Sequence, residues 1–172
     1  ADIGAQLTVQ AALTDGTGVD EIITSAPTAP VVAENDGAAV VSIAGLAQEH
    51  ETLTASISVA DPDGAGSAPT FQWLRDVIAI FGANSETYSL ASTDVGHAIS
   101  AQAFYTDGQG FSEGPVSAAS APVIAVNDGV ASVSVSGAAV EHQVLSAAVG
   151  ADPDGNGALS YQWLRNGVAI AT

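Results

Sequence analysis

The chain contains two copies of one long sequence pattern. The stretch ADPDGAGSAPTFQWLRD begins at Ala60, and the very similar ADPDGNGALSYQWLRN begins at Ala151. The similarity extends upstream, where ENDGAAVVSIAGLAQEHETLTASISV from Glu34 resembles VNDGVASVSVSGAAVEHQVLSAAV from Val126. Self-similarity at a fixed spacing is the signature of repeat architectures, in which each copy folds as one structural unit. We therefore interpret the chain as copies of one small fold.

Alignment of the copies predicts one complete repeat and two partial ones. Asn35 corresponds to Asn127, 92 positions later, and two one-residue gaps follow before the tryptophans. ADIGAQLTVQAALTDGTG from Ala1 matches TDVGHAISAQAFYTDGQG from Thr93. The two partial repeats together lack only the equivalent of residues 83–92. The predicted domains are the C-terminal part of a repeat at 1–34, a complete repeat at 35–126 and the N-terminal part of a repeat at 127–172.

Each repeat has the pattern of short β-strands. Apolar residues occupy every second position in several stretches, as in half-buried strands. Helix is disfavoured because β-branched residues and Gly interrupt every stretch. The alternating residues are Val41 and Ile43; Leu53, Ala55, Ile57 and Val59; and Ile99, Ala101, Ala103 and Tyr105. The strands predicted for the complete repeat are 38–44, 52–60, 70–76, 77–81, 87–91, 98–106 and 112–125.

Seven short strands in about 90 residues predict the fold class. We expect an all-β chain of tandem immunoglobulin-like antiparallel β-sandwich repeats. Trp73, on the third predicted strand, lies where such sandwiches bury a tryptophan. The motif TDVG at 93–96 resembles the corner that precedes the sixth strand, although it lacks the tyrosine of a tyrosine corner.

The charge of the chain excludes several partners. The formal net charge is −17, and Arg75 and Arg165 are its only cationic side chains apart from histidine. Binding of nucleic acid needs clusters of Lys and Arg, so we predict no nucleic-acid partner. The longest apolar runs, such as VIAIF at 77–81, are far shorter than the roughly 20 residues of a membrane helix, which predicts no membrane insertion. The acidity fits either a divalent cation as partner or simple solubility.

The motifs NDG, ADPDG, YQWLRNGVAI, DVGHAI and YTDGQG resemble a known family. They are similar to the tandem immunoglobulin-like or cadherin-like repeats of giant bacterial surface adhesins, including repeats-in-toxin adhesins. The resemblance covers essentially the whole chain. It implies a bacterial protein that is secreted, extracellular or at the cell surface, an extended shape and stiffening by calcium.

Acidic turns recur at one end of each predicted repeat. In an up-and-down arrangement of strands, the linker at 34–37, the DPDG loop at 61–64 and the TDGQG hairpin at 106–110 share one end. Clustered carboxylates repel one another unless a cation or water separates them, and Ca²⁺ takes six to eight oxygen ligands. The alternative is that Asp, Pro and Gly are simply good turn formers. The predicted calcium ligands are Asn35, Asp36, Asp61, Asp63, Asp107, Asn127, Asp128, Asp152, Asp154 and Asp15.

Other residues with chemical potential favour structural roles. His50 and His142 occupy the same repeat position, which favours a structural or interfacial role, and His97 stands alone. Arg75 and Arg165 also recur, and each is expected to pair with a nearby carboxylate. Phe104, Tyr105 and Phe111 are candidates for core packing or for a surface that stacks on sugars. No arrangement of nucleophile, base and acid is evident, so we do not expect an enzyme.

Two classes of function remain open. The first is a structural repeat module of a secreted adhesin or extracellular filament, stiffened by calcium, whose partners are neighbouring repeats or subunits. If the chain is a native subunit, residues 127–172 of one copy could be completed by residues 1–34 of the next. If it is a fragment, the neighbouring repeats belong to the same, longer polypeptide. The second class is a module that binds carbohydrate, such as surface glycans, or a matrix component.

Overall fold

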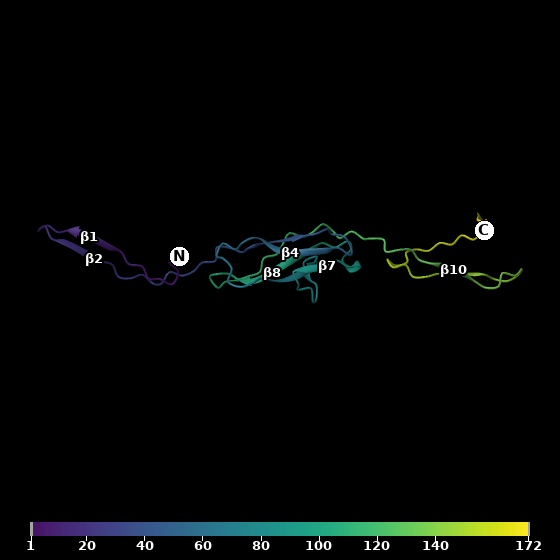
Figure 1. Cartoon of the computed structure of the whole chain (residues 1–172), viewed down its shortest axis with the longest axis horizontal. Helices are drawn as coiled ribbons and strands as arrows, with labels where there is room; N and C mark the ends of the chain where they lie inside the picture. Colours follow the sequence, from purple (N-terminus) through teal and green to yellow (C-terminus); the bar gives the residue numbers. More distant parts are fainter. Residues whose placement is uncertain (1, 172) are drawn as a thin grey trace.

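The computed structural model describes residues 2–171 and is elongated (Figure 1). A hairpin, a body of two sheets and a further set of strands follow one another along its long axis. We call them the N-terminal segment (2–34), the central unit (35–126) and the C-terminal segment (127–171). The first and last residues, which belong to the two predicted partial repeats, lie outside the described range.

The prediction of an all-β chain with antiparallel sheets is confirmed. Regular structure in residues 2–171 consists of strands and one 3₁₀ turn, η1, at Ser92–Asp94. Within this range no helix has the length and apolarity needed to cross a membrane.

The central unit contains two sheets. One has the strand order β3-β4-β7, with β3 at Val40–Ala44, β4 at Thr52–Val59 and β7 at Thr87–Ser89. The other has the order β6-β5-β8-β9, with β5 at Thr70–Arg75, β6 at Ile78–Ala79, β8 at Ile99–Thr106 and β9 at Ser112–Glu113. All strand pairs are antiparallel.

Side chains from both sheets form one core. Leu53 and Ala55 of β4 belong to the same buried cluster as Ile99 and Ala101 of β8. Trp73 of β5 is also fully buried, as its position in the repeat predicts. Its indole N–H donates a 2.9 Å hydrogen bond to the Ser85 carbonyl, and its ring stacks on Tyr88 at 5.6 Å between centroids. This satisfies the one polar atom of the largest core side chain.

A β-bulge interrupts the alternation of β4. Val41 pairs with Ile57, but Val40 pairs with Val59, so Ser58 is an extra residue on β4. The extra residue turns Val59 outward, and Val59 is exposed although alternation places it in line with Leu53. The first alignment gap falls at this bulge: in the C-terminal segment Val133 pairs with Val149, and the next residue, Gly150, already bonds to the Ser132 carbonyl.

The last predicted strand, 112–125, is regular only over β9. Beyond β9 the chain follows β8 through separate bonds, such as those from Ser117 N–H to the Ala101 carbonyl and from Ser120 N–H to the Ile99 carbonyl. The hydroxyls of Ser117 and Ser120 in turn accept hydrogen bonds from the N–H groups of Ala101 and Ile99. Serine hydroxyl oxygens thus replace backbone carbonyls as hydrogen-bond acceptors, and the regular ladder of backbone hydrogen bonds is interrupted.

The two flanking segments hold smaller sheets. β1 (Gln10–Thr14) pairs with β2 (Asp20–Thr24), β10 (Val133–Ser136) with β11 (Ser146–Val149), and β12 (Leu164–Arg165) with β13 (Val168–Ala169). Several of their hydrogen bonds match those of the central unit at equivalent positions. For example, Val9 N–H donates to the Ser25 hydroxyl as Ala101 N–H donates to that of Ser117.

Candidate metal site

Three loops meet at the end of the central unit nearest the N-terminal segment, as the strand order predicts. Gly108 N–H donates a 3.0 Å hydrogen bond to the Gly64 carbonyl, which joins the hairpin 106–110 to the loop 61–64. Asp36 N–H donates to Asp63 Oδ2 at 2.7 Å, which joins the linker to the same loop. Gly66 and Gly108 are required here, because a Cβ on either would clash with the backbone of the facing loop.

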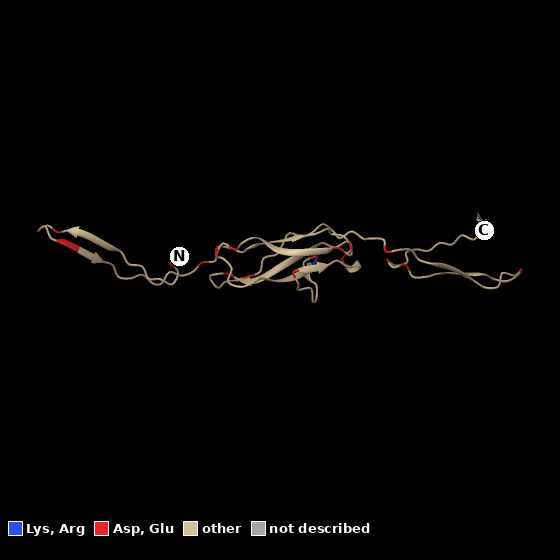
Figure 2. Cartoon of the chain, viewed as in Figure 1, with Lys and Arg blue, Asp and Glu red and all other residues tan. Residues whose placement is uncertain are grey.

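Asp61, Asp107 and Glu113 bring three carboxylates together at this end. One oxygen from each lies within 4.8 Å of the other two. Asp61 and Asp107 are buried and Glu113 is partly buried. Carboxylates this close repel one another strongly in a buried setting, so an arrangement of this kind favours a cation between them. Figure 2 shows acidic residues at this end of the central unit and again at its opposite end.

Asp107 is the most informative member of the cluster. It is 2% exposed, and its Oδ1 accepts hydrogen bonds from the N–H groups of Gln109 at 2.9 Å and Phe111 at 2.8 Å. Its buried Oδ2 has no hydrogen-bond partner among the described residues. Buried polar atoms in folded proteins nearly always have a partner, which can be protein, water or an ion. A cation beside Asp61 and Glu113 would supply that partner.

Hydrogen bonds from the core strand β8 and from its own loop hold the Asp61 carboxylate in place. Its Oδ2 accepts a 2.7 Å hydrogen bond from the Tyr105 hydroxyl, whose oxygen accepts one from Ala39 N–H at 2.6 Å. Burial, together with the hydrogen bond to Asp61, raises the pKa of Tyr105 above its ordinary value, so the hydroxyl stays a donor at neutral pH. The other oxygen, Oδ1, accepts from Asp63 N–H at 2.8 Å.

A second layer of polar side chains surrounds the three carboxylates. The Asn35 amide donates to Glu113 Oε1 at 2.5 Å, and the Gln109 amide donates to Asp63 Oδ1. The structure therefore brings Asn35, Asp61, Asp63 and Asp107 together, while Asp36 takes part through its backbone. All the side chains in this layer and in the cluster carry oxygen atoms. Oxygen is the ligand atom that a hard cation such as Ca²⁺ prefers.

Four of the predicted ligands form an equivalent arrangement in the C-terminal segment. Asp128 N–H donates to Asp154 Oδ2 at 3.0 Å, and Asp154 N–H donates to Asp152 Oδ1 at 3.0 Å. Asn127 Oδ1 accepts from Gly129 N–H, as Asn35 Oδ1 accepts from Gly37 N–H. The loop geometry is thus reproduced, but the equivalents of Asp107 and Glu113 are Asp15 and Glu21 in the distant N-terminal segment.

Asp15 illustrates the turn-forming alternative. Its Oδ1 accepts hydrogen bonds from Val19 N–H, from Thr17 N–H and from the Thr17 hydroxyl, and the side chain lies on the exposed hairpin of the N-terminal segment. These bonds, the one from Val19 first, lower the pKa of Asp15. Asp107 makes the same two backbone bonds, so turn formation explains one of its oxygens and leaves the other unexplained.

The opposite end of the central unit carries a smaller acidic cluster at the junction with the C-terminal segment. Glu49, His50 and Asp128 each place one potential ligand atom within 4.8 Å of the others. His50 Nε2 lies 2.8 Å from Asp128 Oδ2, and Glu49 Oε2 accepts a 3.2 Å hydrogen bond from Val126 N–H. These contacts fix the start of the C-terminal segment against the central unit, which agrees with an interfacial role for His50.

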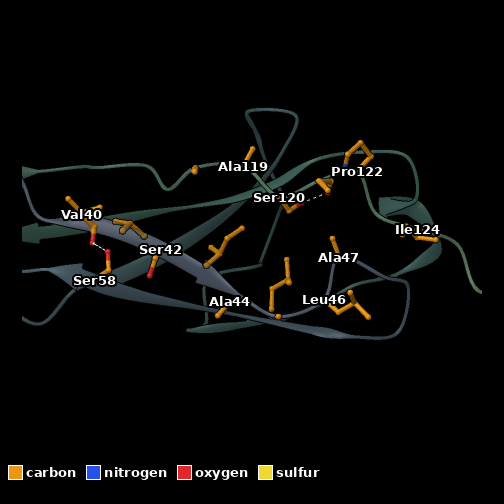
Figure 3. A pocket seen from close by; sticks show the side chains of 16 residues that line it. Val40, Ser42, Ala44, Leu46, Ala47, Ser58, Ala119, Ser120, Pro122 and Ile124 are labelled. Carbon is orange, nitrogen blue, oxygen red and sulfur yellow. Dashed lines mark hydrogen bonds between the residues drawn. The ribbon is translucent and has the colours of Figure 1, made fainter.

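The remaining candidates have structural surroundings. Arg75 pairs with Asp94, as expected for an arginine in so acidic a chain, whereas the same expectation is not met for Arg165, which is exposed and has no ion pair in the described structure. Phe104 is exposed, but its neighbour Tyr105 points to the opposite face of β8 and packs against the core. A groove of about 460 Å³ runs between β3 and residues 118–124 (Figure 3). Its described lining has no charged or aromatic side chain, so it offers neither metal ligands nor a stacking surface.

Sequence reasoning did not identify Glu113 or Glu49. Glu113 lies on β9 opposite Tyr105, and Glu49 is buried although it directly precedes the exposed His50. Both glutamates recur, as Glu21 and Glu141, and that recurrence is the signal that could have found them.

Comparisons of the chain with protein-family models, with curated proteins and with solved structures found no match.

Proposed function

We propose that the chain is a structural module of a secreted bacterial surface adhesin or extracellular filament. Its units are tandem immunoglobulin-like β-sandwich repeats whose clustered acidic loops bind Ca²⁺. The observation that carries the proposal is the buried Asp107 carboxylate, which faces Asp61 and Glu113 and has an oxygen without a partner in the described structure.

The mechanism is stiffening. The acidic loops lie where the chain passes into the central unit, and the linker residue Asn35 is bonded to Glu113. A Ca²⁺ ion bound by Asp61, Asp107 and Glu113 would tie the loop 61–64, the hairpin 106–110 and β9 together, and Asn35 would fix the linker to them. In a linear array, where each unit contacts only its neighbours, rigid junctions add up to a rigid rod.

Thermal unfolding of the 172-residue chain tests the proposal. Burial of Trp73 reports on the central unit, and Ca²⁺, Mg²⁺ and chelator are compared at low protein concentration. An ion at 100 times its Kd stabilises the folded state by about 2.7 kcal/mol. For a unit of this size that corresponds to a rise in Tm on the order of 10 °C with Ca²⁺.

Asp107→Asn should abolish this rise, because it removes the charge at the centre of the cluster. Asp15→Asn is the matched control, since Asp15 makes the same turn but belongs to no close cluster of three potential ligands among the described residues. An identical Tm in Ca²⁺ and in chelator would contradict the proposal, as would a Ca²⁺-induced rise that Asp107→Asn leaves unchanged.

A further inference from the structure

A pocket of about 290 Å³ lies beside the hairpin that joins β5 to β6. β5 ends at Arg75 and β8 begins at Ile99, which pairs with Arg75, so the pocket lies at the end of the central unit opposite the three carboxylates. The side chains that matter for its chemistry are those of Arg75, Asp76, Ile78, Phe81 and His97. The pocket therefore belongs entirely to the complete repeat.

One wall of the pocket is an exposed aromatic ring. The Phe81 side chain is fully exposed, and Ile78, which lines the same pocket, is 72% exposed. Large apolar side chains that gather on a surface mark interaction sites. The face of an aromatic ring is negative and attracts groups with a partial positive charge, among them the C–H groups of a sugar ring. Phe81 thus offers the stacking surface that the groove beside β3 lacks.

The polar side chains of the pocket keep unused hydrogen-bonding capacity. Arg75 donates from Nε to Asp94 and from Nη2 to Thr93, which leaves Nη1 without a partner among the described residues. His97 Nδ1 lies 2.5 Å from Asp76 Oδ2, and this hydrogen bond lowers the pKa of Asp76, so the carboxylate is ionised at neutral pH and accepts. In the neutral imidazole Nδ1–H is then the donor, and Nε2 is left as an acceptor.

A donor and an acceptor in one pocket match a hydroxyl group, which both donates and accepts. An apolar peptide would bury Arg75 Nη1 and His97 Nε2 without partners, at a cost in affinity. An anion is disfavoured because Asp94 already neutralises Arg75 and the chain has a net charge of −17. The ligand that fits all three observations is neutral, carries several hydroxyls and has an apolar face.

We propose that this pocket binds one neutral hexopyranose ring of a glycan. Phe81 stacks on the C–H face of the ring, Arg75 Nη1 donates to a hydroxyl oxygen, and His97 Nε2 accepts from a hydroxyl. Pockets that hold small molecules begin at about 300 Å³, so the volume fits a single sugar ring. The inference goes beyond the proposed function and does not rest on calcium.

The second copy of the repeat shows that the fold does not require these side chains. Phe81 corresponds to Ala171 and His97 to Ala5, although the arginine is kept as Arg165. A hollow lined by Arg165 and Ala171 occurs at the equivalent position, without an aromatic ring. The aromatic ring and the imidazole are thus particular to the complete repeat, and a ligand explains their position in one pocket better than folding does.

Saturation-transfer NMR of the 172-residue chain with the methyl pyranosides of glucose, galactose, mannose and N-acetylglucosamine tests the inference. At least one glycoside should receive saturation, most strongly at the C–H protons of one ring face. The chemical shifts of the His97 imidazole should report a Kd of about 1 mM, the value that the ligand efficiency of a molecule of this size allows.

Phe81→Ala should weaken binding of that glycoside by about tenfold, because it removes the stacking face, and Phe81→Trp should preserve binding. His97→Ala should weaken it by about fivefold through the lost acceptor. Phe104→Ala is the matched control, since Phe104 is 45% exposed on β8 and does not line the pocket. The Tm of the Phe81 variants should be unchanged, because the side chain is fully exposed.

Absence of saturation transfer to all four glycosides overturns the inference, and so does a Kd that Phe81→Ala leaves unchanged or that Phe104→Ala raises equally. The titrations are run both in Ca²⁺ and in chelator. Sugar binding without a calcium-induced rise in Tm would overturn the calcium proposal alone. A rise in Tm without sugar binding would overturn this inference alone.

Discussion

The Arg75 guanidinium and the Asp94 carboxylate form the one ion pair of the described structure in which the acidic partner is fully buried. Arg75 Nε donates to Asp94 Oδ1 at 2.7 Å, and the Tyr88 hydroxyl and Ala91 N–H donate to Oδ2 at 3.0 and 2.9 Å. The pair therefore joins β5 to β7 and to the turn η1, across the two sheets.

Removal of Arg75 should destabilise the central unit strongly. Arg75→Ala leaves the Asp94 charge buried without its cation, and breaking such a pair costs about 3 kcal/mol or more. Urea unfolding followed through Trp73 fluorescence measures the loss. Arg165→Ala, at the equivalent exposed position, should change the same transition by less than about 0.5 kcal/mol at low protein concentration. Equal effects of the two substitutions would show that the buried pair contributes little.

Protonation of His50 should control the junction with the C-terminal segment. The hydrogen bond to Asp128, with the charges of Asp128, Glu49 and Asp154, raises the pKa of His50 above 6.5. A raised pKa in the folded state means that the contact is fully stabilised below pH 6.5 and loses this stabilisation as the pH rises through the folded pKa. NMR titration of the imidazole in the Asp128→Asn variant should return the pKa toward 6.5.

Asp36→Asn is the control for that titration, because Asp36 is the equivalent of Asp128 at the other end of the central unit. It should leave the His50 titration unchanged. A His50 pKa that Asp128→Asn does not lower would mean that the contact does not form in solution.

Loss of the Tyr105 hydroxyl should cost stability without any change in core volume. Tyr105→Phe leaves Ala39 N–H without its acceptor and Asp61 Oδ2 without its donor, both in partly buried surroundings. Unsatisfied groups of this kind cost about 1–3 kcal/mol. Chemical denaturation gives the loss, and Tyr161→Phe, at an exposed tyrosine, should be nearly neutral. Identical denaturation midpoints for the two variants would show that the hydrogen bonds of the Tyr105 hydroxyl do not contribute to stability.

The turn between β5 and β6 should accept glycine with a gain in stability. Asp76 and Val77 both have positive φ, of 46° and 67°, and Val77 is exposed. A β-branched residue is strained in this conformation, whereas two-residue hairpin turns favour Asp-Gly and Asn-Gly. Val77→Gly, which reproduces the glycine of the Asn166–Gly167 turn, should raise the unfolding free energy by roughly 0.5–1 kcal/mol.

Val116→Gly is the matched control for the turn, because Val116 is also exposed but does not have a positive φ. Glycine there should lower stability through its greater freedom in the unfolded chain. A loss of stability on Val77→Gly would show that the valine side chain makes a contribution larger than the strain.

Period-two alternation predicted the inward faces of β4 and β8 because both strands have one face on the core. It placed Leu53, Ala55, Ile99 and Ala101 correctly. It failed at Val59, since a bulge depends on one residue without a partner and leaves no trace in the pattern of a single strand. Only the shorter second copy, which lacks the extra residue, marks the position.

The side chains predicted for the acidic end were those of its loops, and they did not include Glu113. Strand order alone places the loops that contain Asp61 and Asp107 at the same end of the unit, without any knowledge of the contacts between their side chains. It does not place Glu113, whose approach depends on the register of β9 against β8, with Glu113 opposite Tyr105. Register of so short a strand is set by tertiary contacts, and sequence pattern alone cannot supply it.

The stretch that leaves the central unit runs parallel to the stretch that follows β3. Ile124 N–H donates to the Ala47 carbonyl at 3.0 Å, and Glu49 N–H donates to the Ile124 carbonyl at 2.9 Å. The chain enters the unit at one end and leaves at the other. A pulling force on the two ends would therefore slide these stretches along each other and load their hydrogen bonds together in shear. Resistance to tension would then depend on these backbone hydrogen bonds at Ile124 rather than on the stability of the whole core.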